Sequence, residues 1–212
     1  ALKPLLDDAP SDGHLGWETV LPEGVTLREI STEEAVQRAA SAPVDRISAL
    51  AAKHAGGAVL LEIPAGSQHQ EPIVLDLSGS GREPVVWGWI LIEIGEGASA
   101  TVALRHFGSA IYAGNISVVV KDGARCEFVS VQAWDDDSVH AGHLATRVGR
   151  DATLRSVVVT LGGEAVRLLQ TVDYDGLGGD ADVRGLYFAD AGQRFEHRSF
   201  VDHAMPNCRS NV

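Results

Sequence analysis

The stretch Ile94-Gly95-Glu96-Gly97-Ala98, followed by Ser99-Ala100-Thr101-Val102-Ala103-Leu104, shows the unit from which most of this chain is built. One aliphatic residue precedes three turn-forming residues and a small residue, and an alternating segment follows. Similar units begin at Ile63, Val120, Val148 and Leu177. The small residues that close the units are Ser67, Ala98, Ala124, Ala152 and Ala181, which gives a nearly constant period. Such a period predicts a solenoid of stacked rungs.

Alternation after each small residue predicts which side chains face inward. In the unit quoted above, Ala100, Val102 and Leu104 are apolar or small, whereas Ser99 and Thr101 between them are polar. Successive strand residues point to opposite faces, so the first set should line an interior and the second should face water. The matching inward sets are Cys126, Phe128 and Ser130; Leu154, Ser156 and Val158; and Val183, Gly185 and Tyr187.

A period of about 28 residues fits one coil made of two strands of about ten residues with turns between them. We therefore predict a mainly β protein, a flattened right-handed parallel β-helix with about two strands per rung. The unit closed by Ser67 places His69 and Glu71 at inward offsets, which is typical of an end rung. The β-helix core should cover residues 58–212.

Residues 1–57 form a different, α-containing N-terminal segment with short helices. Leu21-Pro-Glu-Gly-Val-Thr-Leu27 indicates a turn that leads into a short strand. A capping box at Ser31-Thr-Glu-Glu34, with Glu34 reaching back, predicts a helix from Thr32 to about Ala40. A second helix should begin at an Asp45 cap and end at Gly56-Gly57.

Composition excludes several classes of function. The formal net charge is −12 with only three lysines, so binding to a nucleic-acid backbone is disfavoured. The longest apolar run, Val85–Ile92, is far shorter than the roughly 20 residues of a membrane helix. We read no export signal, and the two cysteines, Cys126 and Cys208, cannot build a disulfide framework. The expected compartment is the cytoplasm, and Cys126 is expected to be a small core residue.

Motifs for catalysis are weak or missing. Gly95–Ala100 loosely matches a dinucleotide fingerprint, but a strand-like segment follows it, so a β-helix corner is favoured. The sequence has no P-loop and no G-x-S-x-G nucleophile elbow. The acidic stretches Asp135–Asp137 and Asp173–Asp182 favour solvated turns over calcium loops, and His140-x-x-His143 favours surface or core histidines. We predict a non-catalytic chain.

The C-terminal stretch holds the sharpest candidates. It reads Gln193-Arg-Phe-Glu-His197 and then His203-Ala-Met-Pro-Asn-Cys-Arg-Ser210. Histidine and thiolate are natural ligands for iron, zinc or a transient cluster. The spacing is not that of a closed zinc site, and alternation places His197 on the inward face with Phe195 and Ser199. A hydrogen-bonded interior histidine is therefore at least as well supported as a metal ligand, and no metal site is assigned.

This stretch resembles the signature of the SufB/SufD family of iron–sulfur cluster assembly scaffolds. That signature runs Gln-His-x-Asp-His, then His-x-x-Pro-x-x-x-Ser, and Glu196 here stands for the Asp while Arg194 replaces the first His. The tail has no other cysteines, which favours the SufD side, and the resemblance covers residues 20 to 212. The chain is expected to stop inside the family's core domain. The family-signature candidates are His197, His203, Pro206, Cys208 and Ser210.

The resemblance implies a β-helix and a scaffold role without catalysis. A SufD-like subunit would pair with a SufB-like subunit through its β-helix and with a SufC-like ATPase through a C-terminal helical domain. The resemblance also implies that this chain binds no cofactor firmly. It places a transient Fe–S cluster on the assembled complex and a reduced flavin, FAD, on some complexes. The family's best-known functional residues would lie beyond Val212. An exposed end strand would also allow a homodimer in isolation.

Two other functions remain open. A polysaccharide-active β-helix enzyme, a lyase or hydrolase, would need carboxylates clustered on an outer sheet. The outward acids Glu127 and Asp182 lie beside Arg125 and Arg184, which is typical of charged surface ladders. The other alternative is an assembly module without cluster chemistry.

Overall fold

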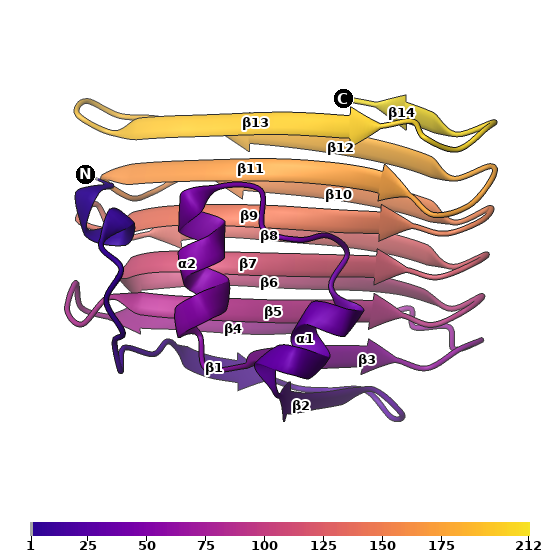
Figure 1. The fold of residues 1–212 in the computed structure, drawn as a ribbon, viewed down its shortest axis with the longest axis horizontal. Helices are drawn as coiled ribbons and strands as arrows, with labels where there is room; N and C mark the ends of the chain where they lie inside the picture. Colours follow the sequence, from indigo (N-terminus) through magenta and orange to yellow (C-terminus); the bar gives the residue numbers. More distant parts are fainter. Residues whose placement is uncertain (1) are drawn as a thin grey trace.

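The computed structural model, which describes residues 2–212, is a flattened parallel β-helix in which two seven-stranded sheets face each other (Figure 1). The sheet that lies in front in Figure 1, the front sheet, contains β13 (Arg194–Asp202), β11 (Ala165–Tyr174), β9 (Val139–Val148), β7 (Ile111–Val120), β5 (Val86–Ile94), β3 (Ala58–Ile63) and β2 (Thr26–Ile30). The back sheet contains β14 (Arg209–Asn211), β12 (Asp180–Tyr187), β10 (Thr153–Thr160), β8 (Arg125–Trp134), β6 (Ser99–Ser109), β4 (Ile73–Ser80) and β1 (Gly16–Thr19). The predicted parallel β-helix is confirmed, with about five turns.

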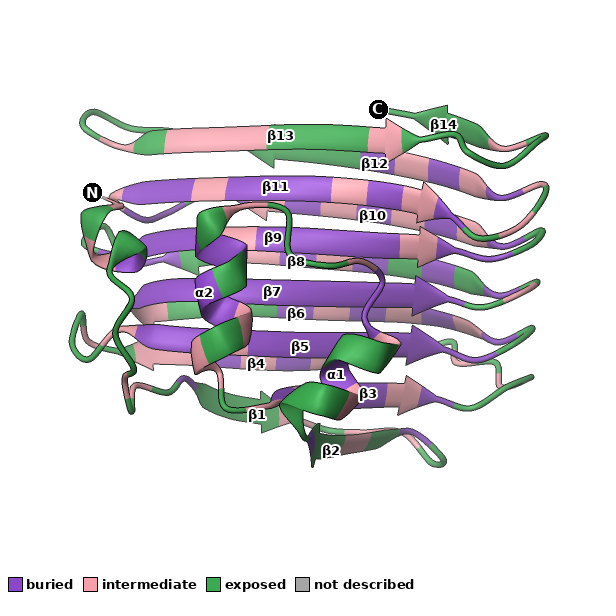
Figure 2. Cartoon of the chain, viewed as in Figure 1, coloured by how far each residue is buried: buried purple, intermediate pink, exposed green. Residues whose placement is uncertain are grey.

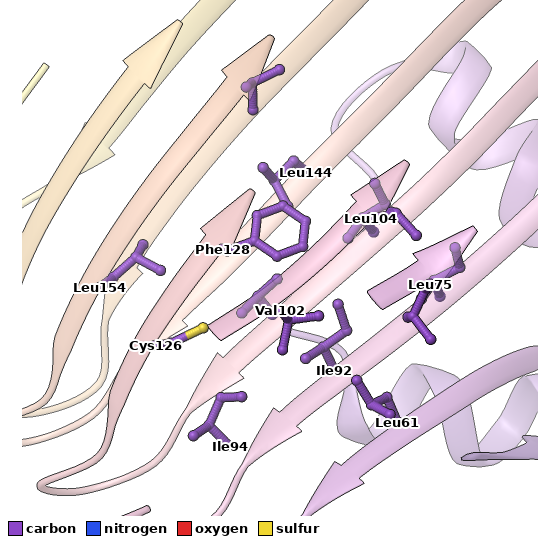
Figure 3. Packing of buried hydrophobic residues seen from close by; sticks show 14 of the residues in the cluster. Leu61, Leu75, Ile92, Ile94, Val102, Leu104, Cys126, Phe128, Leu144 and Leu154 are labelled. Carbon is purple, nitrogen blue, oxygen red and sulfur yellow. The ribbon is translucent and has the colours of Figure 1, made fainter. Parts of the chain in front are cut away.

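Neighbouring rungs stack in register, so equivalent residues of successive units lie above one another. Ser99 of β6 pairs with Arg125 of β8, which pairs with Thr153 of β10. The inward sets predicted for β6, β8 and β10 are buried, and their apolar members join one core between the sheets (Figure 3). The period and the alternation therefore predicted the core correctly in the middle rungs.

The last unit differs from the prediction. Thr153 of β10 pairs with Asp180, and Val148 pairs with Tyr174, so the aliphatic position of this unit is Tyr174 and the small residue is Gly179. Leu177 was the wrong anchor because one extra residue enters this turn. The predicted small residue, Ala181, lies an even number of positions after Gly179, so Val183 still faces inward and is buried. The other two predicted inward residues of this unit, Gly185 and Tyr187, are exposed, since β14 covers only the start of β12 (Figure 2).

The turns that follow the front strands stack into a ladder of left-handed residues. Positive φ angles recur at Gly66, Gly97, Gly123, Asp151, Gly178 and Asn207. Each of the first five donates its backbone N–H to a carbonyl in the turn of the next rung, as Gly97 does to Asp122 at 2.9 Å. Glycine reaches this conformation without steric cost, which explains the repeated turn sequence. The corner predicted at Gly95–Ala100 is confirmed, since β6 follows it directly.

The N-terminal segment adds a 3-10 turn, η1 (Lys3–Leu6), and two helices, α1 (Thr32–Arg38) and α2 (Arg46–His54). The hydroxyl of Ser31 caps α1, but the Glu34 side chain pairs with Arg28 at 2.7 Å, so the second half of the predicted capping box is wrong. The cap of α2 at Asp45 is confirmed. Neither helix of the described residues is long and apolar enough to cross a membrane.

Both helices cover the outer face of the front sheet (Figure 1). Leu50 and Ala51 of α2 pack with Trp87, while Ala35 of α1 packs with Trp89. The strand predicted after Gly24 is β2, which pairs antiparallel with β3. The sequence did not reveal β1, which pairs antiparallel with β4 and ends the back sheet in the same way. Two antiparallel strands therefore close the N-terminal end of the solenoid.

Candidate functional site

The signature residue His197 points into the interior from the last front strand, β13. It lies opposite Leu168 of β11 in the register. Its Nε2 is 2.8 Å from the Thr160 hydroxyl, and its ring meets the edge of Tyr187 at a centroid distance of 5.3 Å. Its Nδ1 is buried and has no hydrogen-bond partner among residues 2–212. Burial lowers the pKa of this imidazole, so His197 is held neutral.

The other signature residues lie in and around the turn that joins β13 to β14. Nε2 of His203 is 2.8 Å from the Ser210 hydroxyl, and its ring lies 5.2 Å from that of Tyr174. The Pro206 carbonyl accepts a hydrogen bond from Gly178 N at 3.3 Å. The Cys208 thiol donates to the Gly176 carbonyl at 3.4 Å. These contacts tie the last turn to the turn of the preceding rung.

The two places do not combine into a metal centre. Across residues 2–212, no group of three or more His, Cys, Asp or Glu side chains is placed to hold a metal ion. His197 engages Thr160 inside the solenoid, whereas His203 engages Ser210 on an exposed turn. As predicted, His197 faces inward, but only one of its nitrogens has a partner. Any cluster chemistry at these residues would need ligands from outside this part of the fold.

His197 is one end of a polar column that runs through the interior from rung to rung. The Gln132 amide donates to the Ser130 hydroxyl at 2.7 Å, and the Thr160 hydroxyl lies 3.1 Å from Oε1 of Gln132 and 2.8 Å from His197. Ser130, Gln132 and Thr160 are all at most 2% exposed. These four side chains, the interior column, reach from β8 to β13.

Sequence reasoning missed most of this column. Gln132 and Thr160 occupy equivalent positions of successive units, and the register adds His106 of β6 and Tyr187 of β12 to the same row. The predicted inward sets contain only three positions per unit, and in β8 the last of them is Ser130. The next inward position of each unit, Gln132 in β8, marks a row of polar and aromatic residues inside an otherwise apolar core.

A cluster of buried rings lies beside the column. The His106 ring is 5.2 Å from that of His140 and 5.3 Å from that of Trp134, and Tyr112 packs against them. The indole N–H of Trp134 donates to Nδ1 of His140 at 3.1 Å. Burial lowers the pKa of His106 to about 4 and lowers that of His140 well below its ordinary value. His140 and His143 are both buried, so His140-x-x-His143 is a pair of core histidines.

The two thiols differ in environment. Cys126 is 1% exposed, and burial raises the pKa of its thiol to about 12, which confirms it as an inert core residue. Cys208 is half-buried in the last turn. Among the outward acids, Asp182 pairs with Arg184 at 2.7 Å, as expected for surface ladder charges. Glu127 lies 3.3 Å from the Thr101 hydroxyl instead of pairing with Arg125.

Comparisons with known proteins agree with the fold and with the signature. Residues 77–212 match the family model described as SUF system FeS cluster assembly, SufBD core domain. Proteins described as iron–sulfur cluster assembly SufBD family proteins, from Mycobacterium bovis and Mycobacterium tuberculosis, are 42% identical over 170 residues. One from Mycobacterium leprae is 41% identical over 170 residues. These matches cover 80% of this chain and 43% of each relative, so the chain spans about half the length of the relatives it matches.

Proposed function

Because the chain belongs to the SufBD family of iron–sulfur cluster assembly proteins, we propose that it forms the body of a SufD-type scaffold subunit. A scaffold needs a rigid frame that presents surfaces to partners. The in-register solenoid supplies such a frame, with residue-by-residue pairing that continues from β3 to β13. The SufD assignment rests on the single partly accessible thiol, Cys208, since Cys126 is sealed in the core.

One observation carries the proposal: residues 77–212 match the SufBD core-domain model and form the in-register parallel β-helix. A SufB-like β-helix is the partner we propose for this solenoid, and a second copy of the chain is its substitute in isolation.

The remaining roles in the proposal belong to the complex. ATP hydrolysis falls to a SufC-like subunit, since the sequence carries no P-loop. The Fe–S cluster is a transient cargo of the assembled complex, and FAD is carried by the complex instead of by this chain. Within the complex, His197 contributes a neutral imidazole whose Nδ1 has no partner among residues 2–212. We place this work in the cytoplasm.

The test is co-expression of the full-length parent protein with its genomic neighbours, followed by purification on this subunit. We expect a SufB-like protein and a P-loop ATPase at fixed stoichiometry. A parent protein that stays alone at low salt contradicts the proposal.

A further inference from the structure

The front sheet has a gap at its N-terminal end. Strand β5 begins at Val86, but β3 begins to pair with it only at Ile90, through Val59. At the other side of the gap, Gly13 forms a single parallel bridge with Val86. The edge of β5 is therefore uncovered over Trp87, Gly88 and Trp89, which is a length of about 10 Å. Figure 1 shows β3 starting well after β5 along the strand direction.

Two backbone groups face this gap. The backbone N–H of Gly95, just after β5, donates to the Ile63 carbonyl of β3, whereas the Ile94 carbonyl accepts from Lys121 on the β7 side. Backbone groups alternate in direction along a strand, so the odd-numbered residues of β5 direct theirs toward β3. In a parallel ladder, a residue pairs through the backbone groups of its two chain neighbours. The pairing of Val86 with Gly13 therefore engages the Trp87 amide, and the pairing of Ile90 with Val59 engages the Trp89 carbonyl. The Trp87 carbonyl and the Trp89 amide are left pointing into the gap. Such groups favour a partner.

A cavity of about 320 Å³ surrounds this edge and is rich in aromatic rings. Three of the four tryptophans of the chain line it, namely Trp17, Trp87 and Trp89, together with Tyr112. Trp17 is 39% exposed and stands at the mouth, while Trp87 and Trp89 are buried. The Tyr112 ring closes the inner side of the cavity, and it lies so near Gly88 that a Cβ at Gly88 would come within 2.8 Å of the ring. We call this space the Trp cavity.

The shape of the gap selects a compact ligand over a peptide strand. Gly13 and Val59 already pair with the two ends, so an added strand could not continue past either end. A flat ring fits between aromatic walls, and pockets of about 300 Å³ or more are usual for small molecules. A ring that also carries a donor and an acceptor at its edge would satisfy both free backbone groups.

We propose that the Trp cavity binds a planar heteroaromatic molecule. Its edge donates a hydrogen bond to the Trp87 carbonyl and accepts one from the Trp89 amide, while its face packs against the aromatic walls. The site lies at the end of the solenoid opposite to β13 and β14 (Figure 1). This inference does not depend on the proposed scaffold function.

The probe is 2-aminopurine, a fluorescent heteroaromatic base with a donor and acceptors on its edge, titrated into the purified protein. We expect saturable quenching with one site per chain. Val59→Phe, which fills the cavity, should weaken binding at least tenfold, and so should Trp17→Ala at the exposed mouth. Val129→Phe is the matched control, because Val129 lies on β8 outside the cavity. It should bind like the unchanged protein.

A second probe tests the hydrogen-bonded edge. N-phenyl-1-naphthylamine is aromatic and almost without edge acceptors, and its binding is followed by energy transfer from tryptophan. We expect it to bind at least tenfold more weakly than 2-aminopurine at this site. Absence of saturable 2-aminopurine quenching up to millimolar concentration would overturn the proposal. Equal affinity for the two probes, or binding that Phe200→Ala weakens and Trp17→Ala does not, would overturn it as well.

Discussion

Acid should destabilise this protein through buried histidines, of which His106 allows the clearest test. His106 is 0% exposed, its Nδ1 lies 3.2 Å from the Val131 carbonyl, and its Nε2 has no partner among residues 2–212. The rings around it, including that of His140, offer no carboxylate to compensate a positive charge. Burial lowers the pKa of His106 to about 4 from an ordinary value of 6.5, because the charged form loses its hydration.

The direction of the effect follows from proton binding. Between these two pKa values, the unfolded chain binds a proton at this position and the folded chain does not, so stability falls as the pH falls. The contribution is fully present above pH 6.5 and is lost on approach to pH 4. It amounts to about 3 kcal/mol in total, of which about 2 kcal/mol should already be lost at pH 5.

The assay is denaturant unfolding at pH 7.5 and at pH 5. The unchanged protein should lose at least about 2 kcal/mol over this range, since His140 titrates in the same direction. His106→Leu should lower the stability at pH 7.5 but reduce the loss between the two pH values by about 2 kcal/mol. His14→Gln, at an exposed histidine, should keep the full loss. An unchanged pH dependence in His106→Leu would refute the reasoning.

Four further substitutions test the interior and the turns. Gln170→Leu should raise the free energy of unfolding by about 1 kcal/mol in urea, because both polar atoms of the Gln170 amide are buried without a partner in residues 2–212. A lower free energy of unfolding in this variant would instead indicate that bound water satisfies the amide. Phe128→Ala should cost about 3–5 kcal/mol, measured the same way, since this 1% exposed ring fills the centre of the core; a cost below 1 kcal/mol would contradict the packing. Asp151→Gly should stabilise the protein by up to about 1 kcal/mol, because Asp151 has a φ of 53° in the turn ladder. Gly123→Asp should destabilise the protein by a similar amount. Thermal melts of the two variants measure both effects.

Local patterns predicted the features that depend on neighbours in sequence. The alternation in β6, β8 and β10 marked the buried residues correctly, because side-chain direction in a strand follows from position alone. The Ser31 and Asp45 caps were predicted for the same reason, since the capping side chain and its amide partner are three residues apart. The turn ladder followed from glycine, which adopts positive φ freely.

Errors arose where the outcome depended on another rung. The anchor of the last unit was placed at Leu177 because its turn contains one extra residue, which only the pairing of Val148 with Tyr174 reveals. The Glu34 carboxylate was expected to reach back to its own helix cap, but Arg28 on β2 offers it a charged partner. Gly185 and Tyr187 alternate as predicted, and the Tyr187 ring packs against that of His197, although both residues are exposed.

By itself the sequence determined the solenoid through its period, the inward face through its alternation, and the family signature through its motif. Each of these patterns can be recognised within a few tens of consecutive residues. Only the tertiary structure decided what those residues meet. His197 joins Thr160 and Gln132 in the interior column because three rungs stack in one register. The Trp cavity exists because β3 begins to pair with β5 only at Ile90, four residues after the start of β5. Both depend on contacts between distant segments, whose register is set by the packing of whole strands and not by local preference.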